Sequence, residues 1–197
     1  MIRNAEAGDA AQLTAWWNDG AVMAHAGWPN GLGTTEDKVT AELMTHSDDT
    51  KRRLIIEING SPAGEMSYRN LNDGSVEIGI KICDSSKQEK GHGRKLLSML
   101  ISELFSMGYD KVVLDTNLNN KRAQHVYESL GFEKVKEHDR MYICAYLYEQ
   151  LQLLFRKDSA PKNILLFVSA FPEELQAALY LTILERQNQP YQWPDLF

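Results

Sequence analysis

The stretch from Gln88 to Leu97 constrains the fold of this chain more than any other. It stands between an alternating apolar run, Val76 to Ile82, and a strongly amphipathic run, Leu96 to Phe105, so the sequence predicts a strand, a glycine-containing turn and a helix. Glycine at a helix start lets the backbone approach a ligand closely, and the first amides of a helix have no partner within it. With the positive end of the helix dipole behind them, these amides form a suitable site for a phosphate.

Two common phosphate-binding patterns do not match this stretch. A P-loop requires Lys and then Ser or Thr directly after its last glycine, whereas Arg94 and Lys95 follow here. The dinucleotide fingerprint requires a third Gly or Ala where Leu96 stands. The pattern that fits is Gln/Arg-x-x-Gly-x-Gly/Ala, over Gln88 to Gly93, which resembles the acyl-CoA pyrophosphate loop of the GNAT N-acetyltransferase superfamily. The alternative is a helix with a flexible glycine start and no ligand.

A second motif resembles the same superfamily. Asn120 to Phe132 matches its Asn-x-x-Ala-x-x-x-Tyr-x-x-x-Gly-Phe segment at every named position. Gly131 is placed as the C-terminal cap of the helix, and Lys111 to Thr116 between the two motifs indicates a buried strand. The resemblance covers roughly residues 1 to 140. It implies a mixed α+β GNAT fold, with a mostly antiparallel, V-splayed sheet flanked by helices.

Further elements are predicted from local patterns. Asn59-Gly60 between two β-forming runs is the preferred type I′ hairpin pair. Asp9 with Gln12, and Thr34 with Asp37, each indicate a helix start. Strands are expected over residues 1–5, 53–58, 61–68, 75–82, 133–137 and 141–148.

The C-terminal segment does not match the family pattern. We therefore divide the chain into a GNAT domain over residues 1–148 and a C-terminal extension over 149–197. In the extension, Ile164 to Ser169 resembles a strand and Glu173 to Arg186 an amphipathic helix. Either Ile164 to Ser169 is the last strand of the sheet after an insertion, or the extension packs on the domain or in a homodimer contact.

Composition excludes several classes of protein. The 197 residues suffice for one domain, and a net charge of −6 argues against nucleic-acid binding and favours a cationic substrate. No apolar run reaches the ~20 residues of a membrane span, and no signal pattern opens the chain, so a cytoplasmic protein without membrane contact is expected. Cys83 and Cys144 do not form a disulfide framework, and the scattered histidines do not predict a metal site.

The resemblance implies acetyl-CoA as the co-substrate. Its pyrophosphate is expected on the amides of Lys90 to Arg94, and its pantetheine arm beside the backbone of Lys81 to Cys83, like an added strand. Asn120 is expected to orient the cofactor or to cap its helix. The residues expected to bind the cofactor are Lys81, Ile82, Cys83, Gln88, Glu89, Lys90, Gly91, His92, Gly93, Arg94, Asn120 and Ala123.

The resemblance also assigns a proton donor. Tyr127 stands where the family's tyrosine protonates the leaving thiolate, although a tyrosine packed on the sheet through its ring is the alternative. For the base that accepts the amine proton, Glu77 is the candidate, with Glu65 as rival and no base at all as a third option. An ion-paired or solvated strand residue is the alternative role of Glu77.

The acceptor site of the family usually lies at the two helices before the central sheet. Trp16, Trp17 and Trp28 are the candidate substrate contacts there, and packing tryptophans are their alternative role. The function implied is an N-acetyltransferase acting directly on an amine of a cationic small molecule or a protein N-terminus. The early Trp-Trp-Asn-Asp and the Trp-Pro loop resemble the branch with ribosomal-protein N-terminal, polyamine and aminoglycoside acetyltransferases. The alternatives are an acyl-CoA-binding sensor without turnover and an interaction module.

Overall fold

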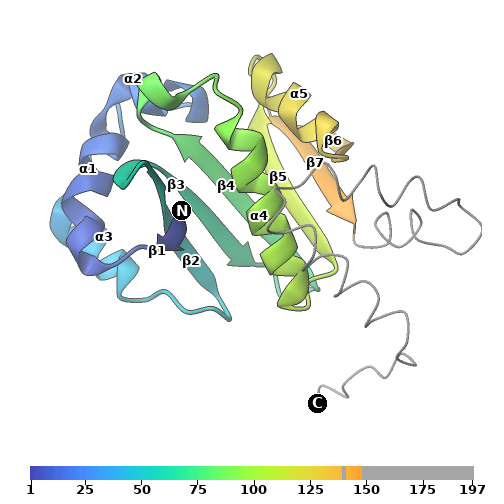
Figure 1. Cartoon of the computed structure of the whole chain (residues 1–197), viewed down its shortest axis with the longest axis horizontal. Helices are drawn as coiled ribbons and strands as arrows, with labels where there is room; N and C mark the ends of the chain where they lie inside the picture. Colours follow the sequence, from blue (N-terminus) through green and yellow to red (C-terminus); the bar gives the residue numbers. More distant parts are fainter. Residues whose placement is uncertain (139–140, 148–197) are drawn as a thin grey trace, which may run out of the picture.

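The computed structural model describes residues 1–138 and 141–147, and the extension predicted over 149–197 therefore lies outside the described residues. Seven strands form one sheet in the order β1-β2-β3-β4-β5-β7-β6 (Figure 1). The strands are β1 Ile2–Asn4, β2 Lys51–Ile58, β3 Ser61–Asn70, β4 Ser75–Ile82, β5 Lys111–Asn117, β6 Glu133–His138 and β7 Met141–Leu147. The helices are η1 Ala7–Asp9, α1 Ala10–Asn18, α2 Gly20–Met23, η2 Ala24–Ala26, α3 Glu36–Leu43, η3 Ser85–Lys87, α4 His92–Ser106 and α5 Lys121–Ser129.

The first four strands form the predicted antiparallel meander. Asn59 and Gly60 both have left-handed backbone angles, φ 56° and 77°, as a type I′ turn between β2 and β3 requires. The register between β3 and β4 is uninterrupted from Asn70↔Val76 to Gly64↔Ile82. Side chains in each strand alternate between the two faces of the sheet, so this register places every second residue of β3 and β4 on the same face.

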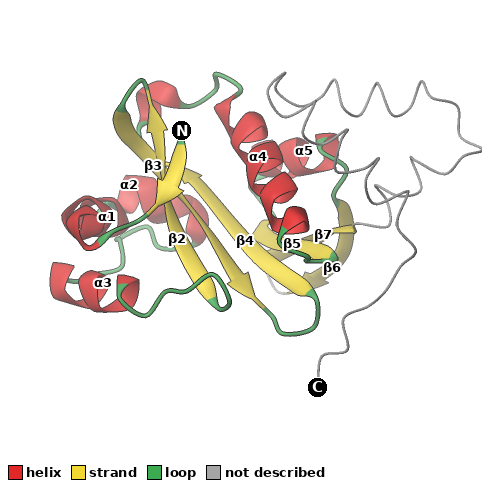
Figure 2. Cartoon of the chain, turned by 60° about the horizontal axis from the view of Figure 1, so that its bottom comes forward, coloured by secondary structure: helices red, strands yellow, loops and turns green. Residues whose placement is uncertain are grey.

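Helices cover the two faces unequally. Helices α1 to α3 lie on one side of the sheet, and α4 and α5 on the other (Figure 2). The larger core lies under α4 and α5 and includes Leu54, Ile56, Met66, Val76, Leu97 and Leu104. The smaller core packs Leu13, Trp17, Val39 and Leu43 on Ile55. Of the strands, only β2 contributes a residue to the smaller core, and Trp17 and Met23 reach Glu65 on β3 and Lys81 on β4. The rest of this face of β3, β4 and β5 is free of it.

The sheet opens between β4 and β5. These strands are parallel and pair only at Ser75↔Lys111, Val76↔Val112 and Glu77↔Val113, after which they separate (Figure 1). Because the pairing lies at the amino ends, the carboxyl ends of both strands lie at the open end of a V. The loop into α4 follows β4, and α5 follows β5, so the amino termini of both helices are at that open end.

Both predicted helix starts lie within one residue of the observed ones, but the side-chain caps predicted for them are wrong. Asp9 does not cap α1 in partnership with Gln12; its carboxylate accepts from the Glu6 amide at 2.8 Å and from the Arg3 guanidinium at 2.7 and 2.8 Å. Helix α3 begins at Glu36 behind Thr35, one residue later than the predicted cap at Thr34, and Thr35 makes no side-chain cap. A nearby guanidinium competes with the helix amides for a carboxylate, and sequence spacing does not show it.

Candidate functional site

The loop between β4 and α4 is tied to the end of β4. The Gln88 side-chain amide donates to the Ile82 carbonyl at 2.8 Å, while Asp84 accepts from the Ser86 amide at 2.8 Å and caps η3. Glu89 and Gly91 then take left-handed backbone angles, φ 60° and 77°. Such angles turn successive amides toward one side, which forms an anion-binding concavity. Gln88 thus orients the loop from the strand.

The amides at the start of α4 remain available. The N–H groups of Lys90, Gly91, His92 and Gly93 donate to no acceptor in the part of the chain that the structure describes. A Cβ atom built on Gly91 would meet nothing within 4 Å, and one on Gly93 would meet only Ile82 Cδ1 at 4.0 Å. Space for a ligand therefore lies directly in front of unpaired amides and the positive end of a fifteen-residue helix.

The second motif lies beside this loop. The Asn120 side chain accepts from the Ala123 amide at 3.2 Å and caps α5, as the capping alternative predicted. The exposed Arg122 guanidinium donates to the Glu89 carboxylate at 3.1 Å and joins the two motifs. Two segments some thirty residues apart in sequence thus meet at the open end of the V.

The edge of β4 that faces the opening presents the backbone groups of different residues from those predicted. The Cys83 amide donates to the Ala63 carbonyl at 2.8 Å, and the Lys81 carbonyl lies 2.2 Å from where a Gly64 Cβ would be, so the backbones of both residues point to β3. Since backbone groups alternate along a strand, those of Ile80 and the N–H of Ile82 point to the opening. A pantetheine arm would pair with these, whereas the predicted set also included Lys81 and Cys83.

The Cys83 thiol is not positioned for chemistry. It is buried, and desolvation together with the charge of Glu65 raises its pKa to about 12. A thiol with that pKa stays protonated at neutral pH and is a poor nucleophile. This agrees with direct transfer to the acceptor and gives no support to an acyl-cysteine route.

Tyr127 lies on the inner side of α5. It is 7% exposed within the larger core, and its ring packs at a tilt against Phe132, with centroids 5.9 Å apart. Its ring therefore stabilises the fold as the packing alternative predicted. Its role as proton donor stays a prediction.

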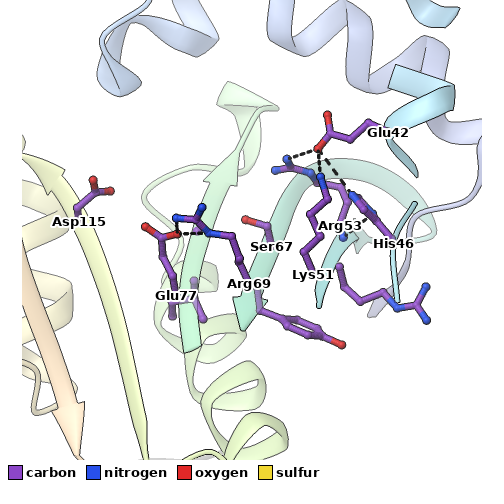
Figure 3. A pocket seen from close by; sticks show the side chains of 12 residues that line it. Glu42, His46, Lys51, Arg53, Ser67, Arg69, Glu77 and Asp115 are labelled. Carbon is purple, nitrogen blue, oxygen red and sulfur yellow. Dashed lines mark hydrogen bonds and ion pairs between the residues drawn. The ribbon is translucent and has the colours of Figure 1, made fainter. Parts of the chain in front are cut away.

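A charged groove of about 370 Å³ crosses the face of the sheet that the smaller core leaves free (Figure 3). From β2 to β5 it is lined by Lys51, Arg53, Ser67, Arg69, Glu77, Gly79 and Asp115, with Glu42 and His46 at its rim. Gly79 leaves the floor of the groove without a side chain at this point, where a Cβ would lie 3.0 Å from Ser67 Oγ. Sequence alternation identified this face of β4, but not the groove.

Glu77 is held in an ion pair within the groove. The Arg69 guanidinium, its partner in the β3–β4 register, donates to one Glu77 oxygen from Nε at 2.9 Å and also from Nη2 (Figure 3). This is the ion-paired role that was the alternative for Glu77. As a base, Glu77 would act against the charge of Arg69, so its predicted catalytic role now requires that this pair opens.

Glu65, the rival base, is buried at 3% exposure and accepts three hydrogen bonds. Trp17 Nε1 donates at 2.8 Å, Lys81 Nζ at 3.2 Å and Arg53 at 3.2 Å. The Arg53 guanidinium also lies over the Trp17 ring at 4.8 Å. Trp17 is therefore a packing residue that orients Glu65, which makes both poor candidates for direct contact with an acceptor.

The other two tryptophans differ from Trp17. Trp16 is half-buried beside the smaller core, whereas Trp28 is 53% exposed on the loop after η2. Residues of η2 come close to β5, one of the strands that line the groove. Because Trp28 is the most exposed of the three and follows η2, it is the strongest of the three predicted contacts.

Two expectations concern metal ions and membrane spans. Among the described residues there is no cluster of three or more His, Cys, Asp or Glu side chains that could hold a metal ion. Likewise, no helix in the described ranges is long and apolar enough to cross a membrane.

Known proteins are similar to this chain in sequence. Residues 1–133 match the family model of the acetyltransferase (GNAT) domain. The chain belongs to the GNAT acetyltransferase family. The L-amino acid N-acyltransferase MnaT of Escherichia coli is 30% identical over 136 residues, which cover 66% of this chain and 78% of that protein. The family prediction is confirmed.

Solved structures of the GNAT family share the fold. The spermidine N-acetyltransferase of Vibrio cholerae, in complex with CoA and spermine, superposes with a TM-score of 0.68 at 21% identity, over 77% of this chain and 97% of that one. YncA of Salmonella typhimurium, a putative acetyltransferase solved with its cofactor acetyl-CoA, gives 0.60 at 26% identity, over 75% and 93%. Both hold CoA or acetyl-CoA, in agreement with the predicted co-substrate.

Several curated relatives are much longer than their match. The chain covers 19% of an uncharacterized protein of Methanocaldococcus jannaschii and 35% of N-alpha-acetyltransferase 30 of Dictyostelium discoideum. These matches therefore support the domain alone.

Proposed function

We propose that this GNAT protein is an acetyl-CoA-dependent N-acetyltransferase that transfers the acetyl group directly to an amine. The observation that carries the proposal is the position of the unpaired amides of Lys90 to Gly93 at the open end of the V, beside a charged groove that includes the carboxylates of Glu77 and Asp115. The first feature suits a pyrophosphate and the second an ammonium group. The opening between β4 and β5 is the space where the thioester and the amine would meet.

Each part of the reaction has a candidate group. The loop amides would hold the pyrophosphate, and the edge of β4 at Ile80 and Ile82 would fix the pantetheine arm as an added strand. The amine nitrogen attacks the thioester carbonyl carbon, the C–S bond breaks, and the thiolate takes a proton from Tyr127. Proton-transfer help of this kind is typically worth ~10²–10⁴-fold.

The acceptor is an amine of a small molecule or a protein N-terminus. The relatives act on different amines: their names include spermidine and L-amino acids. The groove in this chain carries both signs of charge, with Lys51, Arg53 and Arg69 beside Glu77 and Asp115. This favours an acceptor with polar groups besides its amine over a simple polycation, and modifies the expectation of a cationic substrate that followed from net charge.

The phosphate loop is tested by Gly93→Glu, with Gly93→Ala as the matched control. A side chain fits at this position in the unliganded protein, so both variants should fold. The carboxylate of the Glu variant would occupy the anion site, and we expect acetyl-CoA affinity, measured by calorimetry, to fall by about 100-fold or more, equivalent to ~2.7 kcal/mol. The Ala variant should retain most of the affinity. Equal affinity in both would refute the loop assignment.

A binding module without turnover is the second candidate. The ion pair of Glu77 with Arg69 and the burial of Tyr127 favour it, because Glu77 is held by a cation and Tyr127 is enclosed in the core. Release of CoA thiol from acetyl-CoA, measured with spermidine, an aminoglycoside, an L-amino acid and a short peptide, separates the two. Thiol release with any acceptor establishes turnover, and silence with acetyl-CoA still bound establishes the module.

A further inference from the structure

Asp115 was not among the residues that the sequence singled out, yet it stands in the groove at the opening of the sheet. On the basis of the proposed function, we propose that Asp115 is the carboxylate that binds the acceptor ammonium and takes its proton before acetyl transfer. Glu77, the predicted base, then stays paired with Arg69, and the two side chains line the same site.

The position of Asp115 follows from the strand register. Glu77 pairs with Val113 in the parallel contact, and paired residues of parallel strands point to the same face. Asp115 is two residues further along β5, on that same face, beyond the last pair with β4. Its carboxylate therefore lies across the opening from Glu77, within the groove and beside the space where the thioester is expected (Figure 3).

Pairing distinguishes Asp115 from every other acid at the groove. Glu77 is paired with Arg69, Glu65 with Arg53 and Lys81, and Glu42 with Lys51 at 3.5 Å. No cationic side chain of the described residues pairs with Asp115, which stays open to the groove. An acid without a cation in a groove of paired charges is the site where an incoming ammonium gains most.

The surroundings of Asp115 raise its proton affinity. Desolvation is the main cause and the charge of Glu77 the second, and together they raise the pKa of Asp115 above its usual value of 3.8, against the effect of its own backbone amide. The charged groups that face it from the neighbouring strands are Glu77 on β4 and Arg69, which pairs with Glu77, on β3, while η2, the element that carries His25, comes close to β5. A more basic carboxylate is a better proton acceptor near neutral pH.

The proton balance of the step is complete. The acceptor arrives as an ammonium ion, and the Asp115 carboxylate takes one proton, which leaves a neutral amine and a carboxylic acid. The amine nitrogen attacks the carbonyl carbon, and the thiolate leaves as the C–S bond breaks. The second amine proton replaces the one that Tyr127 gives to the thiolate, and Asp115 releases its proton to water after the products leave.

The test uses the full chain with Asp115→Asn, Asp115→Glu and, as a matched control, Asp37→Asn on the exposed start of α3. The probes are spermidine, an aminoglycoside, an L-amino acid and a tetrapeptide with a free α-amine. Thiol release gives kcat/KM, calorimetry in the presence of CoA gives amine affinity, and a separate titration gives acetyl-CoA affinity. For the best probe, we expect Asp115→Asn to lower kcat/KM about 100-fold with acetyl-CoA affinity unchanged.

Two further readouts separate catalysis from structure. Asp115→Glu should recover part of the rate, because a carboxylate is restored one methylene further out. Raising the pH should also recover activity of Asp115→Asn, since the neutral amine then forms without a base. A variant that had only lost structure would show neither recovery, and its thermal unfolding would shift.

The outcomes are distinguishable. If wild-type protein turns over a probe and Asp115→Asn does so as well as Asp37→Asn, Asp115 has no such role while the proposed function stands. If wild-type protein releases no thiol but binds acetyl-CoA, the proposed function fails, and the calorimetry decides on Asp115. Equal amine affinity in wild-type and Asp115→Asn protein, or no amine affinity in either, then overturns the assignment.

Discussion

The two faces of β3 and β4 differ sharply although alternate residues of the same two strands form them. On one face, Met66, Tyr68, Val76 and Ile78 are buried under α4 and α5. On the other, Glu65, Ser67, Arg69 and Glu77 alternate with them, and the last three line the charged groove. A shift of one residue in register would exchange the two sets, so apolar burial on one face fixes the position of the polar groups on the other.

This comparison predicts that mutations on the apolar face reduce stability and that mutations on the groove face reduce activity. Glu65 is the exception that would break the rule, since it lies on the groove face but is buried.

Glu65→Ala should have the largest effect on stability. It removes the acceptor of three donors and leaves Arg53 and Lys81 beside each other without their carboxylate. Removal of one partner from a buried charged pair typically costs about 3–5 kcal/mol. Urea unfolding of Glu65→Ala against Glu77→Ala measures this, and an equal small loss in both variants would show that the groove face contributes no stability.

Leu97→Ala should follow. Leu97 is 1% exposed in the core under α4, and truncation of such a leucine leaves a cavity that costs about 2–5 kcal/mol. Leu32→Ala is the matched control, because Leu32 is 39% exposed. The difference in unfolding midpoint between the two variants measures what the apolar face contributes. Similar midpoints would place the core elsewhere.

A third effect concerns pH and the rim of the groove. Burial lowers the pKa of His46 below its usual 6.5, with Lys51 as the second cause, while its Nδ1 accepts from the Arg53 amide at 3.2 Å. The folded protein therefore binds fewer protons here than the unfolded chain, and stability should decrease as the pH falls from 6.5 toward the folded pKa. His46→Gln should weaken this dependence in thermal unfolding between pH 7 and 5, as compared with His125→Gln.

Arg69→Ala should have the smallest effect on stability. The Arg69–Glu77 pair is exposed, with Arg69 at 61%, and such pairs contribute about 0–1 kcal/mol. The same change frees Glu77, so the rate of thiol release with a given amine is the informative measurement. A change in rate without a change in unfolding midpoint would sharpen the distinction between the two faces.

Much of the fold was predictable because its signals are local. Alternation identified β4, the Asn59-Gly60 pair identified the β2–β3 hairpin, and helical spacing identified α4 and α5. The two motifs predicted the family that the comparison confirmed. Each of these signals is complete within about fifteen residues of sequence.

The contents of the groove were less predictable because they depend on contacts that are distant in sequence. Trp17 and Glu65 are 48 residues apart, and nothing in the sequence around either indicates that they bond. Asp115 is the one acidic residue of β5, and its importance follows only from the missing pair across the opening. The backbone groups at the free edge of β4 could likewise be identified only from the register with β3. That register directs the backbone groups of Lys81 and Cys83 to β3 and not to the opening.

The short contact between β4 and β5 has a mechanical consequence. Only three residue pairs join the strands, and Val76 and Val112 at its centre are both 0% exposed. This contact is the pivot from which the two strands diverge, so it sets how wide the opening becomes further along both strands. A small change of side-chain volume at the pivot would be magnified at the open end, so residues that touch neither substrate could set the distance between them.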